Sequence, residues 1–536
     1  MQLPSRQQVR RPRRVILSLI GGAVAISRRP LLAEETGAAI IAETEYGRVR
    51  GMSLRGVHMF RGIPYGGPTD GAGRFLPPSR PMKWAGVRDC TGPSTRCVQG
   101  AGNIFMSPLI GEYFAGGRPD RAELSKQADS EDCLVLNVLT QGLSGKRPVM
   151  VYIHGGGFTN GSAALTLFGD GLVREQDVVL VGINHRLNVF GYAYLGGLSS
   201  KYATGNVGQL DLVAALEWVH RNIARFGGDP QNVMIFGESG GGAKISALMA
   251  MPAAKGLFHK AAVQSGSALR ASTVEDATAS ARKILANLGL TDQQVDELQK
   301  IPAARLLEAA RSWLDVVVDG HSIPTQTWEP TAPDVSATVP MIIGNDKDES
   351  TLFSLKDEEL FRLDDAALRA RVVKANISDA EVDRLLALYR RDHPSDSPTD
   401  LYFRISTDRG ARRNATRQTE LKVAQGKASV YMYYCQYNTP LGTEVAKIRA
   451  FHTSDLPLTM RLVKFAESER LSRQLSGAWA AFARTGNPSQ KGLDWKAYTL
   501  ERRETMIFDA SKSEVVNDPD KDERLMLRDR PSGSLL

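Results

Sequence analysis

The sequence predicts an α/β fold, in which a central, mostly parallel and twisted sheet carries helices on both faces. Short runs of apolar, β-forming residues alternate with stretches in which apolar residues recur at helical spacing. The runs are continuously apolar, which is typical of strands buried on both faces, and strand–helix–strand alternation favours parallel pairing. The six predicted core strands are Val149–His154, Val178–Asn184, Val233–Phe236, Lys260–Gln264, Pro340–Ile343 and Ser429–Tyr437.

Helical spacing is clearest over residues 208–226, between the second and third strands, where apolar residues recur every three to four positions. Two longer helical segments, about 273–315 and about 355–426, lie in connections between later strands. The first of them contains a capping-box signal, Thr291-Asp292-Gln293-Gln294. We therefore expect a single domain over residues 34–536, with both segments as helical insertions beside or over the sheet.

Residues 1–33 differ from the rest of the chain in charge. They hold seven arginines and no acidic residue, so seven of the eight net positive charges lie there. Arg13-Arg14 precedes an apolar run, Val15–Ile26, that is too short to span a bilayer comfortably, and Leu31-Leu32-Ala33 offers a cleavage site. This order resembles a bacterial twin-arginine export signal. An uncleaved membrane anchor and a disordered basic tail are the alternatives.

An export signal predicts a periplasmic or secreted protein that starts near Glu34 and keeps no stable membrane span after cleavage. The remaining body is nearly neutral, so we expect no nucleic-acid partner. The four cysteines, Cys90, Cys97, Cys133 and Cys435, form no C-x-x-C, so no metal or redox motif is expected. A disulfide suits an exported protein, but the spacing alone does not choose the pair.

The run Phe236–Lys244 carries the G-x-S-x-G pattern, with Ser239 at its centre, directly after the third predicted strand. A strand that turns abruptly into a helix strains the middle residue, and side chains on either side would collide. The flanking glycines therefore predict an exposed serine nucleophile. A glycine-rich turn is the alternative, so the prediction depends on a base, an acid and oxyanion donors elsewhere.

Chain order restricts the base and the acid. In the α/β-hydrolase arrangement the order is serine, acid, histidine. Three acids follow the strand at 340–343, namely Asp346, Asp348 and Glu349, and only His393 and His452 lie beyond them. His393 stands in a polar, proline-punctuated stretch typical of a surface loop. We favour His452 as general base, and a purely structural histidine is the alternative.

The run His154-Gly155-Gly156-Gly157 follows the first predicted strand. Consecutive glycines let bare N–H groups approach a substrate carbonyl oxygen with no side chain in the way. A phosphate cradle is the competing interpretation, but the chain lacks the Gly-Lys-Ser/Thr ending of a P-loop and G-x-G-x-x-G at this junction. The run therefore predicts an oxyanion hole.

Further ordered motifs make residues from about 45 to 524 similar to the type-B carboxylesterases, the cholinesterase-like branch of the α/β-hydrolases. Those motifs include Phe60-Arg61-Gly62-Ile63-Pro64-Tyr65, Ser130-Glu131-Asp132-Cys133, Phe226-Gly227-Gly228-Asp229-Pro230, Gln264-Ser265-Gly266 and Trp479-x-x-Phe482. The resemblance implies the α/β-hydrolase fold and a serine hydrolase that cleaves carboxylic esters through an acyl-enzyme. It implies no metal and no organic cofactor.

The same resemblance implies roles for particular residues. Ser239 would be the nucleophile, Glu349 the triad acid and His452 the base. The N–H groups of Gly156, Gly157 and Gly240 would form the oxyanion hole, and Cys97 and Cys133 a disulfide. Cys90 and Cys435 have no counterpart in the family pattern, and we expect both to be buried thiols. The chain departs from the family pattern at Ser350, where glycine is usual, and at Gly240, where alanine is usual.

The absence of two expected aromatic residues restricts the class of ester that we expect as substrate. True cholinesterases resemble each other in placing a tryptophan before the Cys133 position, where it binds the choline cation. Residues 98–132 contain no tryptophan, and Leu352 stands where an aromatic residue is expected. We therefore expect a small-molecule ester other than a choline ester as substrate. A lipase or an amidase on the same machinery is the runner-up, and a non-catalytic binding module is a remote alternative. The sequence predicts neither the natural ester nor the oligomeric state.

Overall fold

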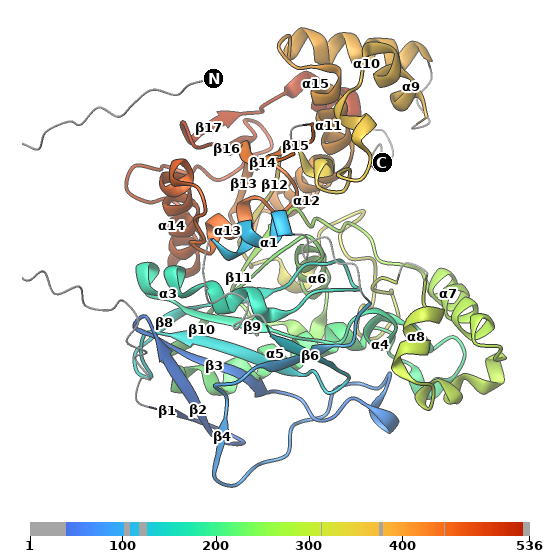
Figure 1. Ribbon diagram of the computed structural model, residues 1–536, viewed down its shortest axis with the longest axis vertical. Coiled ribbons are helices and arrows are strands. Elements are labelled where there is room, and N and C mark those ends of the chain that lie inside the picture. Colours follow the sequence, from blue (N-terminus) through green and yellow to red (C-terminus); the bar gives the residue numbers. More distant parts are fainter. Residues whose placement is uncertain are drawn as a thin grey trace, which may run out of the picture. The chain divides into compact units, whose positions relative to one another are not determined.

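The computed structural model describes residues 39–100, 108–116, 126–311, 314–374, 379–443 and 445–528 (Figure 1). The predicted export signal lies outside the described residues. Within them, thirteen strands form one sheet. Twelve of these strands pair one after another across the sheet, and the thirteenth, β4, pairs with β2. In spatial order the strands are β1 (Ile40–Thr44), β2 (Gly47–Leu54), β3 (Val57–Pro64), β7 (Val135–Thr140), β9 (Val179–Ile183), β8 (Arg147–Ile153), β10 (Gly228–Glu238), β11 (Lys260–Gln264), β12 (Met341–Asp346), β13 (Val430–Cys435), β16 (Glu504–Phe508) and β17 (Glu514–Asn517), with β4 at Val87–Asp89.

The centre of this sheet is parallel and its margins are antiparallel, except that β4 pairs with β2 in parallel. Strands β9, β8, β10, β11, β12, β13 and β16 pair in parallel. Strands β1, β2, β3, β7 and β9 pair antiparallel in turn, as do β16 and β17. All six predicted strands are present, as β8 to β13. The sheet as a whole is mixed, so the parallel pairing predicted from the sequence holds for its centre.

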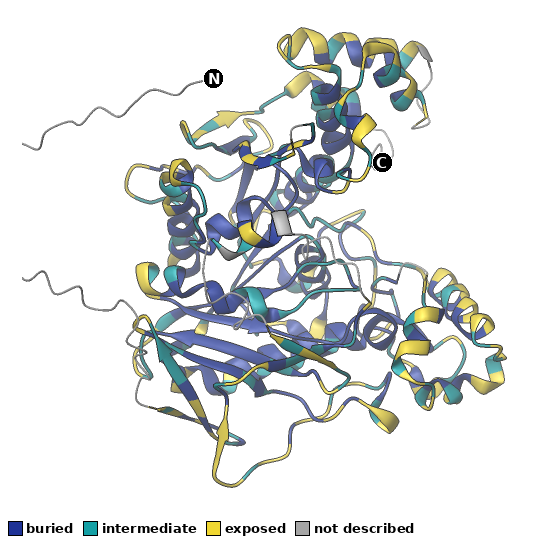
Figure 2. Ribbon diagram, viewed as in Figure 1, coloured by how far each residue is buried: buried dark blue, intermediate teal, exposed yellow. Residues whose placement is uncertain are grey.

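Alternate residues of the central strands divide the core into two layers, and the strands themselves are buried almost throughout (Figure 2). One layer joins Val149, Val151 and Ile235 to helices α5 (Val207–Asn222), α6 (Gly240–Leu248) and α12 (Arg413–Ala424). The other joins Met150, Tyr152 and Phe236 to helices α3 (Asp170–Gln176) and α14 (Glu469–Thr485). The sheet is therefore covered on both faces, as the apolar strands predict.

Helices occupy much of both segments that were expected to interrupt the strand–helix rhythm. Between β11 and β12 lie α7 (Val274–Asn287), the 3₁₀ helix η7 (Asp292–Gln299) and α8 (Ala303–Ala309). Between β12 and β13, before α12, lie α9 (Asp365–Val373), α10 (Asp379–Asp392), α11 (Pro398–Thr407) and a π-helical turn, η11 (Asp408–Arg412). In Figure 1, α7 and α8 lie together, apart from the group of α9, α10 and α15 (Lys521–Leu527).

The predicted capping box is present at the start of η7, where the Thr291 N–H donates to Gln294 Oε1 at 3.1 Å. The remaining strands and α-helices among the described residues are short and lie in the connections. They are β5 (Ser94–Cys97), α1 (Pro108–Ala115), β6 (Gln127–Ser130), α4 (Asn188–Tyr192), β14 (Thr439–Gly442), β15 (Lys447–Arg449) and α13 (Asp455–Thr459). Among the described residues, no helix combines the length and the apolar character needed to cross a membrane.

Candidate active site

Ser239 stands at the sharp turn between β10 and α6. Its φ and ψ of 56° and −126° are unusual for a residue with a side chain, which marks a strained junction. A Cβ at Gly237 would lie 2.6 Å from the carbonyl oxygen of Ile153, and one at Gly241 would clash with the same oxygen. Ser239 N–H donates to the Gln264 carbonyl at 2.8 Å, which fixes the turn to β11. The turn predicted from G-x-S-x-G is therefore present, for the predicted steric reason.

The structure brings His452 and Glu349 together. His452 Nδ1 contacts Glu349 Oε2 in a short hydrogen bond, and both side chains are buried. Glu349 Oε1 accepts a second hydrogen bond, from the Asp346 N–H at 2.9 Å. The backbone N–H of Glu349 donates to Thr407 Oγ1 at 3.1 Å, so α11 also fixes the backbone of this residue. The ends of β12 and α11 therefore orient the acid that orients the imidazole.

The other acids after β12 have different partners. Asp346 accepts hydrogen bonds from the Ser454 hydroxyl at 2.9 Å and the Ser454 N–H at 3.1 Å. Asp348 Oδ2 accepts from the Ala450 N–H at 3.3 Å. Both acids thus brace the loop that carries His452, and the imidazole contacts only Glu349 of the three. The rejected base, His393, instead contacts Glu523, with His393 Nε2 2.6 Å from Glu523 Oε1.

The second imidazole nitrogen faces a residue that the sequence analysis did not single out. His452 Nε2 lies 3.2 Å from Glu238 Oε1, and Glu238 is the residue directly before Ser239. Among the described residues, no hydrogen bond joins Ser239 to His452. The sequence places Glu238 beside the serine, but nothing in the pattern signals that its carboxyl group is buried against the base.

This contact changes the electrostatics of the base. Burial alone would lower the pKa of His452, but Glu238 and Glu349 outweigh burial and raise that pKa to about 9. Burial in turn raises the pKa of Glu238 well above its usual range. The imidazolium form of His452 is therefore favoured at neutral pH. To act as a general base, His452 would first have to lose this proton.

The glycine loop after β8 lies against the start of α6. Gly156 and Gly157 have φ of 88° and 59°, which favours glycine. Within the described residues, neither their N–H groups nor that of Gly240 donates a hydrogen bond. The Gly240 N–H is the first of α6, where helical N–H groups have no partner in their own helix. All three N–H groups are therefore available to an incoming oxygen.

The structure also explains why glycine stands at position 240. A Cβ there would lie 2.5 Å from both the Cα and the N of Gly157. The loop thus packs directly on the backbone of α6, with no room for the methyl group of alanine. This close packing explains why the chain has glycine at position 240, where alanine is usual in the family.

Lys244, one turn further along α6, is a second residue that the sequence analysis did not identify. Its side chain is completely buried, and Nζ donates to the His154 carbonyl oxygen at 3.0 Å. Because the C=O and N–H of a trans peptide point in opposite directions, this bond orients the peptide between His154 and Gly155, the first of the glycine loop. Burial lowers the pKa of Lys244 to about 7, and Glu238 opposes that shift. His154 is held further by stacking on His185, with ring centroids 4.8 Å apart.

An aromatic residue lies beside the base, one position after the one expected. Leu352 is buried in a small core cluster with Ile448 and Phe451. Phe353 is 53% exposed, and its ring centroid lies 5.1 Å from that of His452. Phe353 therefore presents an apolar ring to solvent at the edge of the site.

The four cysteines are buried free thiols in the structure. The predicted bond between Cys97 and Cys133 is not formed in it, although the two side chains are neighbours. A hydrogen bond with Cys97, followed by burial, raises the pKa of Cys133 well above its usual range. Burial raises the pKa of Cys90 to about 12 and that of Cys435 well above its usual range. Cys90 and Cys435 are thus buried thiols, as predicted.

Comparison with known proteins gives consistent matches along the whole of the described chain. A profile of the carboxylesterase family matches residues 38–526. A para-nitrobenzyl esterase of Bacillus subtilis is 35% identical over 515 residues, covering 91% of this chain and 98% of the relative. A human cocaine esterase is 31% identical over 523 residues, covering 91% and 89%.

Solved structures of similar sequence share the fold. A carboxylesterase of Geobacillus stearothermophilus superposes with a TM-score of 0.75 at 35% identity, covering 91% of this chain and 99% of its own. An esterase of Clostridium hathewayi that can hydrolyse aliphatic aromatic polyesters superposes with a TM-score of 0.75 at 31% identity, covering 91% and 98%.

Proposed function

Since the chain belongs to the carboxylesterase family and is a carboxylic ester hydrolase, we propose that Ser239, His452 and Glu349 perform its chemistry. The observation that carries this proposal is the contact of Glu349 with Nδ1 of His452, close to the strained turn that presents Ser239. An acid that holds one imidazole nitrogen leaves the other to act as a base.

The reaction proceeds in two acyl-transfer steps. His452 takes the proton of the Ser239 hydroxyl as its oxygen attacks the ester carbonyl, and Glu349 stabilises the imidazolium. The N–H groups of Gly156, Gly157 and Gly240 bind the oxyanion of the tetrahedral intermediate. The alcohol leaves with a proton from His452, and water then repeats the sequence on the acyl-enzyme. For the first step, His452 Nε2 must exchange its contact with Glu238 for one with the adjacent Ser239.

Replacement of the nucleophile tests this assignment. Ser239→Ala should abolish hydrolysis of a p-nitrophenyl ester, because no other group described in the site can carry the acyl chain. Ser280→Ala, on α7, is the matched control and should keep full activity. Both variants should melt like the parent protein, and an active Ser239→Ala protein would disprove the assignment.

We propose small-molecule carboxylic esters, including aryl and benzyl esters, as the substrate class. The names of two similar proteins, a para-nitrobenzyl esterase and a cocaine esterase, support this choice, as does the exposed ring of Phe353 beside the base. A panel of esters of increasing acyl length, an anilide and a choline ester measures the preference. Hydrolysis dominated by long-chain acyl esters would indicate a lipase, and efficient anilide cleavage would indicate an amidase.

We also propose that residues 1–33 direct export and that the exported protein forms the Cys97–Cys133 disulfide. The support is the twin-arginine-like order of residues 13–33 and the neighbouring positions of the two thiols. Mass analysis of exported protein should find a first residue near Glu34 and two cysteines that resist alkylation until they are reduced. A chain that starts at Met1, or four reactive thiols after denaturation, would refute the respective proposal.

A further inference from the structure

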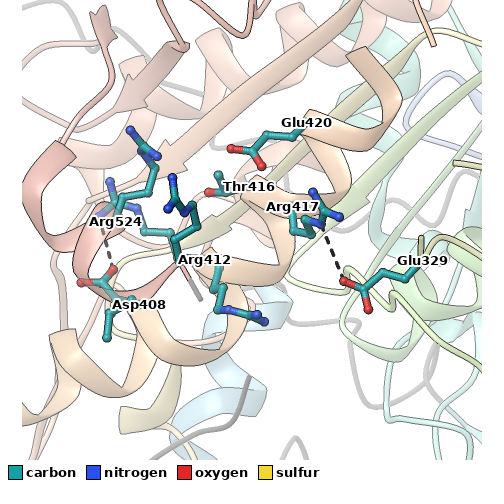
Figure 3. Close-up of a pocket in the computed structure, with 10 residues that line it drawn as sticks. Glu329, Asp408, Arg412, Thr416, Arg417, Glu420 and Arg524 are labelled. Atoms are coloured by element: carbon teal, nitrogen blue, oxygen red, sulfur yellow. Dashed lines mark hydrogen bonds and ion pairs between the residues drawn. The ribbon is translucent and has the colours of Figure 1, made fainter. Parts of the chain in front are cut away.

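A cavity of about 410 Å³ beside α12 is lined by none of the proposed catalytic residues. Figure 3 shows its walls, which come from η11, α12, the end of α15 and the loop at Glu329. Half of its ten lining residues are arginines, namely Arg412, Arg413, Arg417, Arg524 and Arg528. We call it the arginine pocket.

Acidic residues also line the arginine pocket, but they do not balance its charge. Asp408 pairs with Arg412 at 3.2 Å, and Glu420 pairs at 2.5 Å with Arg503, which lies outside the lining. Glu329 lies 3.6 Å from Arg417, the pair joined by a dashed line in Figure 3. The lining itself holds five arginines and three carboxylates, those of Glu329, Asp408 and Glu420.

Arg413 is the most informative member of the pocket. Its Nε is buried and has no hydrogen-bond partner among the described residues, and no ion pair of its guanidinium group is recorded there. A buried donor without a partner costs free energy that an acceptor in the cavity would recover. Arg413 and Arg417 are four residues apart on α12, so both guanidinium groups serve the same face of the helix.

Arg417 is available to a ligand as well. Its side chain is 42% exposed, and its 3.6 Å separation from Glu329 exceeds hydrogen-bonding distance. Guanidinium groups bind carboxylates and phosphates through paired hydrogen bonds, and this geometry makes arginine the usual residue for such anions. The volume of the cavity suits an anion with a small organic body better than a bare inorganic ion.

We propose that the arginine pocket is an effector site for a small organic anion with two or more carboxylate or phosphate charges. Two consecutive residues, Thr407 and Asp408, connect the pocket to the active site. Asp408, which lines the pocket, follows Thr407, whose hydroxyl group accepts the N–H of Glu349. An anion that competes with Asp408 for Arg412 acts on the π-helical turn next to the support of the triad acid.

The experiment uses the full-length protein at low ionic strength, where charge contacts are weakly screened. Calorimetric titrations with citrate and with inorganic phosphate measure binding, with chloride at matched ionic strength as the reference. The same additions during hydrolysis of a p-nitrophenyl ester measure the effect on kcat/KM. The test variant is Arg413→Gln/Arg417→Gln, and the control is Arg305→Gln, an exposed arginine on α8.

We expect citrate to bind, and the double variant to bind it at least about tenfold more weakly, whereas Arg305→Gln binds like the parent. We also expect bound citrate to change kcat/KM about fivefold or more in the parent and not in the double variant. The stronger binder, citrate or phosphate, identifies the preferred anion class. Absence of binding, or equal binding by the double variant, would overturn the site. Binding without a change in rate would overturn its effector role.

The rate effect rests on the proposed function, whereas binding does not. If Ser239→Ala remained active, the catalytic assignment would fail and the binding result would stand. Among the described residues, Arg413 makes no ion pair and Arg417 makes only the 3.6 Å contact with Glu329, so the double variant should fold, and its melting temperature checks this directly.

Discussion

The two halves of the active site are held in place by different means. The half with His452 and Glu349 is built from side-chain hydrogen bonds, because Asp346, Asp348 and Thr407 each hold one of its loops. The half with the glycine loop is built from close backbone packing on α6 and from one buried amine, that of Lys244. Activity should therefore fall when a polar group is removed from the first half, or when an atom is added to the second half.

The largest effect should follow loss of the base in the first half. His452→Asn should lower kcat by at least about 10⁴-fold, because it removes the imidazole that accepts the serine proton. His393→Asn is the matched control, since His393 contacts Glu523 instead. Steady-state kinetics on one ester measures both variants. Comparable losses in the two variants would place the base outside His452.

The second half should fail when a single methyl group is added. Gly240→Ala places a Cβ 2.5 Å from the Cα and N of Gly157, so the glycine loop must move away from α6. Displacing an oxyanion donor typically costs about 10²- to 10³-fold in kcat. Gly92→Ala, where a Cβ meets no atom within 4 Å, should be silent. If Gly240→Ala matched the parent in kcat, the close packing would not matter for catalysis.

Loss of the buried amine should have a smaller effect on the same half. Lys244→Met removes the hydrogen bond to the His154 carbonyl and frees the first peptide of the glycine loop. We expect kcat to fall between about tenfold and a hundredfold with KM little changed. Lys422→Met is the control, because Lys422 is also buried but binds the carbonyls of Ser336 and Ala337. Both variants should lose stability, and a similar fall in kcat for both would show that Lys244 is merely structural.

The smallest effect concerns the contact between the two halves, that of Glu238 with His452. Activity requires an unprotonated base, so kcat/KM should rise as pH rises through the pKa of His452. Glu238→Gln removes a carboxylate that favours the imidazolium, so this rise should move to lower pH. The exposed Glu358→Gln serves as the control and should leave the pH profile unchanged. A shift to higher pH would contradict the stabilisation of the imidazolium by the Glu238 carboxylate.

The parts of the active site also differ in how far the sequence could predict them. Ser239, His452 and the glycine loop follow from motifs and chain order, because each stands next to a recognisable strand. The marginal strands β1 and β2 were missed, since their burial alternates and only continuous apolar runs were used as a signal. Lys244 could not be predicted, because its burial against the His154 carbonyl arises only when β8 and α6 pack together.

The measurement that tests the central claim most directly is covalent labelling with a fluorophosphonate, followed by peptide mapping. Only an activated serine reacts with this reagent at a useful rate. The account predicts one phosphonate per chain, on the peptide that contains Ser239, at a rate that parallels loss of esterase activity. It also predicts no label in His452→Asn protein over the same time. Inactivation with the label on any other residue would contradict the assignment.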